Sequence, residues 1–374
     1  MVRNKRSKQK DKYWRVPDQA LLGVVLALLI TGLAAVSSAS AVLSFERFGH
    51  SNYYFFRQLI FVAIGLGLLF VVSRVDYHLW KKFAGWILIS GVIALILVAI
   101  PSLGFKSGGT RAWFNLGPFL LQPSEFGKLA LVIYLASWFD RKEGAETNFW
   151  FGIVPPLLVV LGLTGLVLIE PDLGTAIVYG IVASVMFFAA GARYKYLIGL
   201  GAVACGALWL LVLAAPYRIA RITTFLHPEQ DPQGSGYHIM QALIAIGSGG
   251  LWGYGFGASR QKHNYLPESI GDSIFAVMAE ELGFIRIVLV VLLFLGFAFI
   301  GLRIARRAPD RFGQLCAVGL TAWVVFQAIV NMGAISNLLP LTGITLPFIS
   351  YGGSSLLSVC IAAGVMLNIS RQQV

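Results

Sequence analysis

Six carboxylates stand out in this 374-residue chain because they lie in or beside long apolar stretches, where a charged side chain is costly. They are Glu125, Glu170, Asp172, Asp272, Glu280 and Glu281. A carboxylate within reach of a hydroxyl can act as a general base, and nearby cations can stabilise an anionic leaving group. Asp272 is the best candidate for such a base, because it ends a long segment that also carries Arg260 and Lys262.

Several of these carboxylates also have structural explanations. Glu125 and Lys128 are three residues apart on one helical face, so an ion pair is the favoured role for them. Asp172 and Asp272 each precede an apolar stretch, and either could cap the first turn of a helix. For these two residues the capping role and the chemical role both remain open.

The adjacent pair Glu280 and Glu281 is predicted to lie about 12 to 13 Å deeper in the membrane than Asp272. Adjacent helical side chains point about 100° apart, so the two should not face one site. We expect one of them to pair with a cation or to accept backbone N–H groups, with Arg286 as the nearby candidate cation. Together with Glu170, this pair is predicted to be structural or supporting.

Other patterns in the sequence carry little chemistry. The three cysteines and the five histidines show no spacing typical of a zinc site, and no phosphate-binding loop of the GxxxxGK type occurs. The string Gly253-Tyr254-Gly255-Phe256-Gly257-Ala258 lacks the strand and helix that a dinucleotide site requires, and a tight turn is the better interpretation. No protein-bound metal is expected.

The composition defines the class of protein. Hydrophobic residues make up 57% of the chain and charged residues only 12%, about half the share in soluble domains. This balance excludes an ordinary soluble enzyme and a disordered protein. Ten apolar stretches are long enough to cross a bilayer as helices. They cover residues 18–44, 54–73, 83–101, 122–139, 149–170, 174–191, 196–215, 273–301, 313–337 and 351–370.

The net charge of +12 is explained by orientation in the membrane and requires no nucleic acid. With both termini in the cytoplasm, nineteen of the 29 lysines and arginines fall in cytoplasmic segments, seven in outer loops and three within spans. This asymmetry satisfies the positive-inside rule. The sequence therefore predicts a multi-pass protein of a cytoplasmic membrane.

The predicted fold class is all-α, a polytopic membrane protein with about ten transmembrane helices and one large extracytoplasmic loop. Residues 1–16 form a basic cytoplasmic tail, and residues 17–374 form a single transmembrane domain whose large outer loop spans 216–272. Polar and Gly/Pro-rich segments gather on the outer side, where such backbone is tolerated only around a cavity or inside protein. We therefore expect a cavity that opens toward the outer leaflet.

A series of strings, in order along nearly the whole chain, resembles one family. They are Gly117-Pro118 with Gln122-Pro123-Ser124-Glu125, Glu170-Pro171-Asp172-Leu173-Gly174-Thr175, Ser259-Arg260-Gln261-Lys262, Tyr265-Leu266-Pro267-Glu268 with Asp272, Ala279-Glu280-Glu281-Leu282-Gly283, Gln327 with Asn331, and Pro340-Leu341-Thr342-Gly343. The chain resembles the SEDS proteins (shape, elongation, division and sporulation), which are membrane-embedded peptidoglycan glycosyltransferases. The strings Ser37-Ser38-Ala39 and Tyr54-Phe55-Phe56 are more similar to the division branch than to the elongation branch.

The resemblance implies ten helices and a polymerase that joins lipid II units into β-1,4 glycan strands at the outer face of a bacterial cytoplasmic membrane. It assigns the essential acid to Asp272. It implies as partners lipid II, the growing glycan strand, membrane lipid, a class B penicillin-binding protein and other division proteins. The chain departs from the family at Ile270-Gly271-Asp272-Ser273, in the spacing around Arg111, and at Arg286.

In this reaction the base removes a proton from an acceptor hydroxyl while cations or helix N-termini meet the charge of the leaving diphosphate. The predicted substrate-binding residues are Arg111, Glu125, Lys128, Asp172, Arg260, Lys262 and Ser354. A divalent cation, Mg²⁺ or Mn²⁺, is a further candidate at the diphosphate. The alternatives are a lipid II flippase, an elongation-type polymerase and a non-catalytic scaffold for a penicillin-binding protein.

Overall fold

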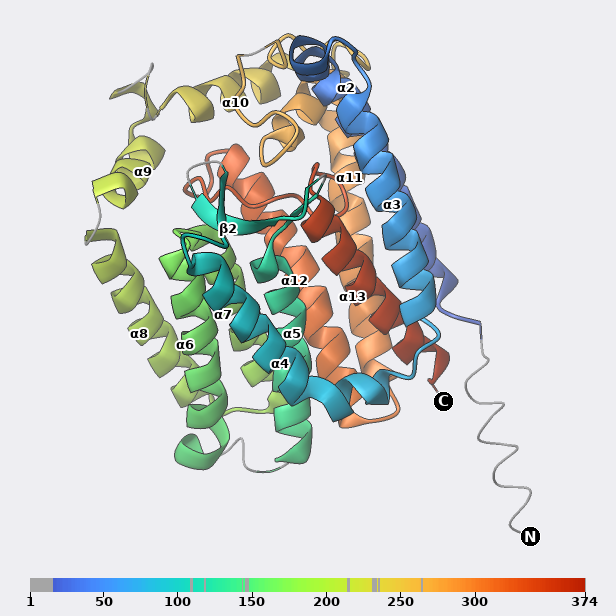
Figure 1. Cartoon of the computed structure of the whole chain (residues 1–374), viewed down its shortest axis with the longest axis vertical. Helices are drawn as coiled ribbons and strands as arrows, with labels where there is room; N and C mark the ends of the chain where they lie inside the picture. The colour runs from blue at the N-terminus through green and yellow to red at the C-terminus, as the bar shows by residue number, and fades with distance from the viewer. Residues whose placement is uncertain are drawn as a thin grey trace.

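The computed structural model describes residues 16–107, 110–117, 119–142, 144, 148–213, 216–230, 234, 236–263 and 265–373. The long helices pack into a bundle, and the connections between them lie at its two ends (Figure 1). The helices of the bundle are α2 (Gln19–Phe48), α3 (Tyr53–Val72), α4 (Tyr77–Ala99), α5 (Pro123–Arg141), α6 (Val154–Ile169), α7 (Leu173–Ala190), α8 (Tyr194–Leu213), α11 (Ile274–Arg306), α12 (Arg311–Ile335) and α13 (Gly353–Arg371). A short π-helix, η3 (Phe149–Ile153), leads into α6.

The prediction of an all-α polytopic membrane protein is confirmed. Within the described residues, eight helices are long and apolar enough to cross a membrane. The two remaining bundle helices, α5 and α8, occupy the predicted fourth and seventh spans. Helix α5 carries Glu125, Lys128, Asp140 and Arg141, which explains its lower apolarity. The predicted tail 1–16 lies outside the described residues except for Val16.

Aspartates begin three helices at one end of the bundle, which we call the lower end. Asp18 caps α2, Asp76 caps α4 and Asp310 caps α12, each accepting a backbone N–H of the first turn. A carboxylate there satisfies otherwise unpaired donors and the positive end of the helix dipole. The backbone N–H of Asp18 donates to Ser370 Oγ at 3.0 Å, so the start of α2 and the end of α13 share this end.

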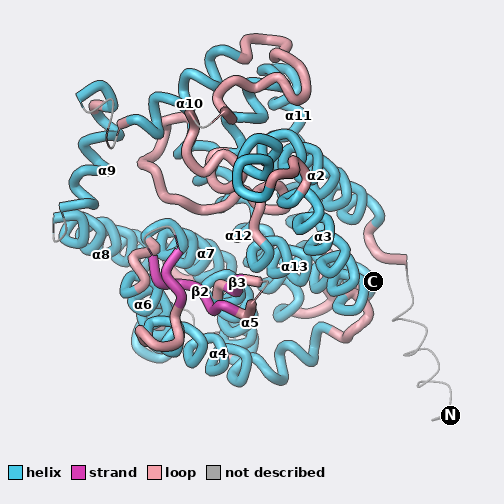
Figure 2. Tube along the Cα trace, turned by 45° about the horizontal axis from the view of Figure 1, so that its top comes forward, coloured by secondary structure: helices cyan, strands magenta, loops and turns pink. Residues whose placement is uncertain are grey.

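The opposite, upper end carries the long connections between helices. The segment after α4 forms a three-stranded antiparallel sheet of β1 (Phe105–Ser107), β2 (Thr110–Asn115) and β3 (Leu120–Leu121). The sequence did not predict this small sheet. The predicted outer loop 216–272 contains α9 (Pro216–Leu226), the 3-10 turn η4 (Pro228–Gln230) and α10 (Tyr237–Ser248). These helices and the adjoining loops lie across the upper end (Figure 2).

Helix α11 is interrupted near its start, and the loop after α10 is bound at the interruption. Gly283 has φ 74° and ψ 173°, which glycine adopts readily and other residues do not. The backbone N–H groups of Tyr254 and Gly255 donate to the carbonyls of Glu280 and Glu281, both at 3.0 Å. In the other direction, Phe284 N–H donates to Gly250 O at 2.8 Å. The loop thus restores the helical hydrogen bonds that the interruption removes.

The close approach of α2 to the segment before α13 gives a test of this packing. A Cβ on Gly32 would meet Phe348 O at 2.5 Å and Ile349 Cα at 2.8 Å. Since backbone atoms cannot move aside easily, Gly32→Ala should destabilise the fold by about 1–3 kcal/mol. We expect a clearly lower midpoint of thermal unfolding for the purified protein in detergent.

The matched control is Gly23→Ala in the same helix. A Cβ at Gly23 meets nothing within 4 Å, and alanine favours a helix over glycine by up to about 1 kcal/mol. Its unfolding midpoint should therefore equal or exceed that of the unchanged protein. Equal midpoints for the two variants would show that the tight contact at Gly32 does not exist.

Candidate active site

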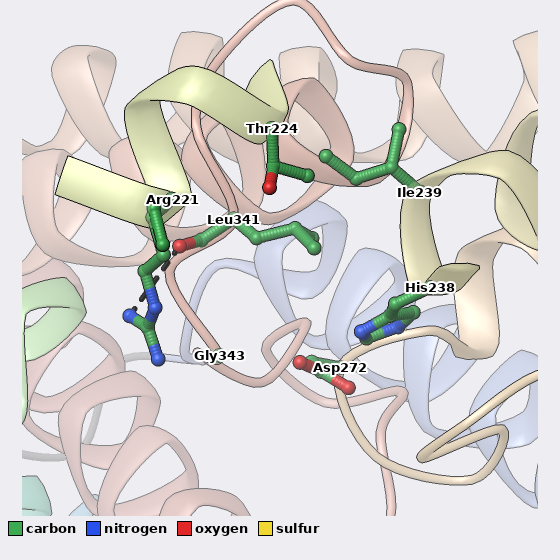
Figure 3. A pocket seen from close by; sticks show the side chains of 8 residues that line it. Arg221, Thr224, His238, Ile239, Asp272, Leu341 and Gly343 are labelled. Carbon is green, nitrogen blue, oxygen red and sulfur yellow. Dashed lines mark hydrogen bonds between the residues drawn. The ribbon is translucent and has the colours of Figure 1, made fainter. Parts of the chain in front are cut away.

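A cavity of about 420 Å³ opens among the connections of the upper end, a size typical of small-molecule sites. It is lined by Ala220, Arg221, Thr224, His238, Ile239, Asp272, Leu341 and Gly343. Figure 3 shows the Asp272 carboxylate and the His238 imidazole facing this cavity, with the Arg221 guanidinium across from them. Three parts of the chain meet here: α9 and α10, the start of α11, and the segment that follows α12.

The backbone at Asp272 is fixed from two sides. Asn331 of α12 donates through Nδ2 to the Asp272 carbonyl and to the Ile344 carbonyl, both at 2.8 Å. On the other side Ser350 Oγ donates to Gly271 O at 2.7 Å. These bonds hold the Asp272 segment against the segment that carries Gly343. The position of the carboxylate is therefore set by neighbouring elements that are far away in the sequence.

The carboxylate of Asp272 is not used as a helix cap. The cap of α11 is Ser273, and Asp272 stands one residue before it. Ser273 Oγ donates to Asp272 Oδ1 at 3.4 Å. Burial, reinforced by the charge of Glu268, raises the pKa of Asp272 from 3.8 to about 7. A pKa in this range suits a group that accepts a proton near neutral pH.

Arg221 and His238 were not among the predicted site residues. Arg221 lies on α9, is half-buried, and donates weakly to Leu341 O at 3.5 Å. His238 lies on α10, and burial lowers its pKa, so its ring is neutral at pH 7. Both residues lie in the one long predicted outer loop, which is the only feature of the sequence that points to them. This feature does not distinguish them from other loop residues, because no spacing in the sequence shows that α9 and α10 reach Asp272.

Lys262, predicted to bind substrate, is instead buried in an ion pair with Glu281 at 3.1 Å. Its ammonium also donates to Gly257 O at 2.6 Å and to Ser38 Oγ at 3.1 Å. Three acceptors occupy the three protons of this ammonium, so the structure leaves none for a diphosphate. The predicted role of Lys262 in substrate binding is therefore corrected to a structural one.

The prediction that Glu280 and Glu281 cannot serve one site is wrong. Both bind the segment 257–262, because this segment wraps around the start of α11. Glu280 accepts the backbone N–H of Arg260 at 2.9 Å and the hydroxyl of Ser259. Glu281 accepts the Ser259 N–H at 3.2 Å and pairs with the lysine described above. The expected structural role of the pair agrees with these contacts.

Two arginines near this segment have other contacts than those expected. Arg286, the candidate partner of the glutamates, donates to Trp252 O at 3.1 Å. Arg260 is exposed, and its guanidinium lies 5.4 Å from the centre of the Tyr254 ring. Arg260 is thus accessible to an anion at the upper end. Its predicted contact with substrate stays a prediction.

Glu125 and Lys128 form the buried ion pair that their spacing favoured. Lys128 Nζ donates to Glu125 Oε1 and to Gln327 Oε1, both at 2.7 Å, and lies 5.5 Å from the Trp323 ring centre. Lys128 is 1% exposed and Glu125 is 4% exposed. Direct contact of either side chain with a bulky substrate would require the bundle to open, so the structure favours a structural role over the predicted substrate role.

Asp172 is a helix cap, one of the two roles left open for it. Its Oδ1 accepts the Thr175 N–H of α7 at 2.9 Å, and Gln122 Nε2 approaches Oδ2 at 3.5 Å. Burial raises the pKa of Asp172, and burial with the nearby Asp172 charge raises that of Glu170 to about 8. Glu170 is 1% exposed, and neither of its carboxyl oxygens has a hydrogen-bond partner among the described residues.

Ser354 and Arg111 complete the predicted set. Ser354 Oγ accepts the Gln122 N–H at 2.9 Å and donates to Leu120 O at 3.2 Å, so it joins the start of α13 to β3. This bracing role differs from the predicted contact with substrate. Arg111 lies half-buried in β2, opposite Lys106 in the sheet register. No described contact assigns Arg111 a function.

Within the described part of the chain, no three His, Cys, Asp or Glu side chains form a group that could hold a metal ion. The cavity itself offers Asp272 and His238 as the side chains of that kind. Two such ligands do not make a resident metal centre, since protein sites of Zn²⁺ or Mg²⁺ need more donors or substrate oxygens.

Comparison with known proteins agrees with this architecture. A protein-family model described as "Cell cycle protein", covering FtsW, RodA and SpoVE, matches residues 18–374. Stage V sporulation protein E of Bacillus subtilis (strain 168) is 45% identical over 95% of this chain and 97% of the relative. A protein of Trichlorobacter lovleyi named probable peptidoglycan glycosyltransferase FtsW is 42% identical over 94% of this chain and 93% of its own length.

Solved structures share the fold over almost the whole chain. A chain of a peptidoglycan synthase complex superposes with a TM-score of 0.80 at 29% identity, covering 96% of this chain and 99% of that one. The rod shape determining protein RodA of Thermus thermophilus gives a TM-score of 0.72 at 28% identity, covering 96% and 98%. The family match extends over nearly all of the sequence. The chain therefore belongs to the FtsW/RodA/SpoVE family of cell cycle proteins.

Proposed function

We propose that this chain is a peptidoglycan glycosyltransferase that joins lipid II disaccharide units into β-1,4 glycan strands. The observation that carries the proposal is the upper-end cavity, in which a carboxylate with a raised pKa, Asp272, faces the cation Arg221. This pairing supplies a base and an anion-binding group on the two sides of one space. Relatives that carry the name peptidoglycan glycosyltransferase cover almost the whole chain and support the same reaction.

The proposed orientation puts the upper end outside the cytoplasm. Cations of the predicted cytoplasmic segments lie within the first or last few residues of helices at the lower end, among them Lys81, Arg141, Arg303 and Arg311. The positive-inside rule then puts the lower end and both termini in the cytoplasm. The cavity with Asp272 would face the side where the cell wall is made.

In the proposed reaction Asp272 accepts the proton of the acceptor sugar's 4-hydroxyl as its oxygen attacks the anomeric carbon of the donor. The new carbon–oxygen bond forms while the bond from this carbon to the lipid diphosphate breaks. The diphosphate leaves with the electron pair, and Arg221 stabilises its growing charge. Attack from the side opposite to the leaving group inverts the anomeric configuration.

The flippase alternative is less well supported by the described contacts. A flippase needs polar groups that a headgroup can contact along the depth of the membrane. The buried charges nearest to such a path, Lys128 and Glu281, are each bound to partners inside the protein. Asp272 and Arg221, which have no ion-pair partner among the described residues, instead line one cavity at the upper end.

We further propose a role in septal wall synthesis, with a class B penicillin-binding protein as partner. Relatives named FtsW or stage V sporulation protein E, at 38–45% identity, support this branch of the family. The similarity to a chain of a peptidoglycan synthase complex supports assembly with such a partner. The elongation-type polymerase is the alternative. Other division proteins, the growing glycan and membrane lipid are further proposed partners.

A divalent cation would arrive with the substrate diphosphate, whose oxygens complete its coordination.

Replacing the proposed base tests the assignment most directly. Asp272→Asn keeps the size of the side chain but cannot accept a proton, so glycan formation should fall by about 10²- to 10⁴-fold. The assay combines purified protein, its penicillin-binding partner and fluorescent lipid II, with strands resolved on a gel. Glu229→Gln, an exposed carboxylate of the same outer segment, is the control that should retain full activity. Undiminished strands in Asp272→Asn would remove Asp272 from the reaction, and lipid II scrambling without polymer would favour the flippase.

The cation across the cavity gives a second test. Arg221→Ala removes the charge that faces the leaving diphosphate, and we expect a loss of about 10²-fold in polymerisation rate, partly recovered in Arg221→Lys. Arg193→Ala changes an exposed arginine at the lower end and should leave the rate unchanged. Equal rates for Arg221→Ala and Arg193→Ala would exclude a catalytic contact of Arg221.

The raised pKa of Asp272 predicts the pH dependence. The base works only when ionised, and its pKa is about 7, so the rate should reach a plateau above this pH. Below pH 7 the protonated fraction grows, and the rate should fall about tenfold per pH unit. The measurement is the initial rate of strand formation between pH 5.5 and 8.5. A rate that stays constant down to pH 5.5 would contradict a base with this pKa.

A further inference from the structure

A chain of hydrogen bonds runs from α10 to the Asp272 carboxylate. His238 Nε2 lies 2.5 Å from Ser273 Oγ, and Ser273 Oγ donates to Asp272 Oδ1 at 3.4 Å. Ser273 is 0% exposed, so its hydroxyl has no access to solvent that could replace either partner. His238 and Asp272 both line the cavity, and Figure 3 shows their side chains beside one another.

A serine hydroxyl has one proton, so the two bonds of Ser273 are linked. When Ser273 donates its proton to Asp272, the proton of the His238–Ser273 bond comes from the imidazole, in the tautomer that carries its proton on Nε2. The ring is otherwise neutral, because burial lowers the pKa of His238. The hydrogen bonds thus all point toward the carboxylate, which is the arrangement that an ionised carboxylate requires.

The backbone N–H groups of Asp272 and Ser273 also bind the carboxylate and favour its ionised form. The side chains of the other elements around Asp272 do not supply this stabilisation. Glu268 of its own segment is negative and opposes ionisation. The contact from α12 is the neutral Asn331, which binds the carbonyl of Asp272 and not its carboxylate. The segment 336–350 contains no charged residue, and Arg221 of α9 faces the carboxylate from across the cavity. The side-chain donor described for this carboxylate is therefore Ser273.

We propose that His238 is a positioning residue that acts through Ser273 to orient the Asp272 carboxylate and keep it ionised for proton abstraction. The inference rests on the proposed function, because Asp272 needs to be ionised only if it serves as the base. A donor at a carboxylate stabilises the charged form, and a second donor behind the first strengthens it by polarisation. Burial and Glu268 favour the protonated acid, and the His238–Ser273 chain opposes them.

The His238–Ser273 chain affects the reaction through the uptake and release of a proton by Asp272. In each cycle Asp272 takes one proton from the acceptor hydroxyl and must return it to solvent before the next sugar is added. While Asp272 is protonated, the hydroxyl of Ser273 still holds Oδ1 in place. Loss of the proton restores the charged acceptor for the Ser273 hydroxyl, to which His238 is bound. The chain thereby favours the return to the active form of the base after every addition.

The experiment measures the acidic limb of the rate–pH profile in the full complex with lipid II. Ser273→Ala removes the donor at the carboxylate, and its limb should move to higher pH by roughly half a unit or more, about threefold in rate at pH 6. His238→Ala should shift the limb in the same direction by a smaller amount. Both variants should approach the unchanged rate on the alkaline plateau, where Asp272 is ionised in any case.

Conservative variants separate positioning from folding. Ser273→Thr keeps the hydroxyl, and His238→Gln keeps an N–H donor of similar reach, so both should retain the unchanged limb. Equal loss of rate at every pH in the alanine variants, or an unmoved limb, would overturn the inference. If the limb is unmoved while Asp272→Asn is inactive, only the role of His238 and Ser273 is rejected. If Asp272→Asn remains active, the proposed base is rejected and the inference with it.

Discussion

The buried ion pair between Lys262 and Glu281 is the interaction on which the upper end depends. It joins α11, the segment 257–262 and, through Ser38, helix α2. Removing one partner of such a pair leaves an unpaired buried charge, which is strongly destabilising. The packing of these three elements therefore depends on both partners. The positive φ of Gly283 allows the same segment to reach the helix backbone. The start of α11, and with it Asp272, is thereby fixed relative to the rest of the bundle.

Two groups of charged side chains in this protein differ in their partners. Glu125, Lys128, Lys262 and Glu281 are paired inside the protein, and each pair fixes elements against one another. Asp272 and Arg221 face a cavity and have no ion-pair partner among the described residues. In a medium that penalises every charge, pairing marks a structural use and an unpaired charge at a cavity marks a chemical one. This contrast separates site from scaffold more reliably than the position of a charge along the chain.

The sequence predicted the class and most helices, because apolar runs and charge asymmetry are local properties. It failed where the answer depends on which distant segments meet. Lys262 looked like a substrate cation because its buried partners, Glu281 and Ser38, lie 19 and 224 residues away. The sequence did not predict Arg221 and His238 as site residues for the same reason. Only the folding of α9 and α10 over the upper end brings them to the cavity with Asp272. The predicted angle between Glu280 and Glu281 was correct for a helix, but a loop that wraps the helix can use both.

The environment of Asp272 resolves two opposing needs. A base must be basic enough to attract a proton, and burial beside Glu268 provides this by raising its pKa to about 7. It must also keep a substantial ionised fraction at neutral pH, which further burial alone would prevent. Donors at the carboxylate counteract burial. In this chain they are the Ser273 hydroxyl, which is bound to His238, and the backbone N–H groups of Asp272 and Ser273. A catalytic carboxylate is most effective when its pKa lies near the working pH. Burial and the hydrogen-bond chain are therefore both necessary, since either one alone would move the pKa of Asp272 away from the working pH.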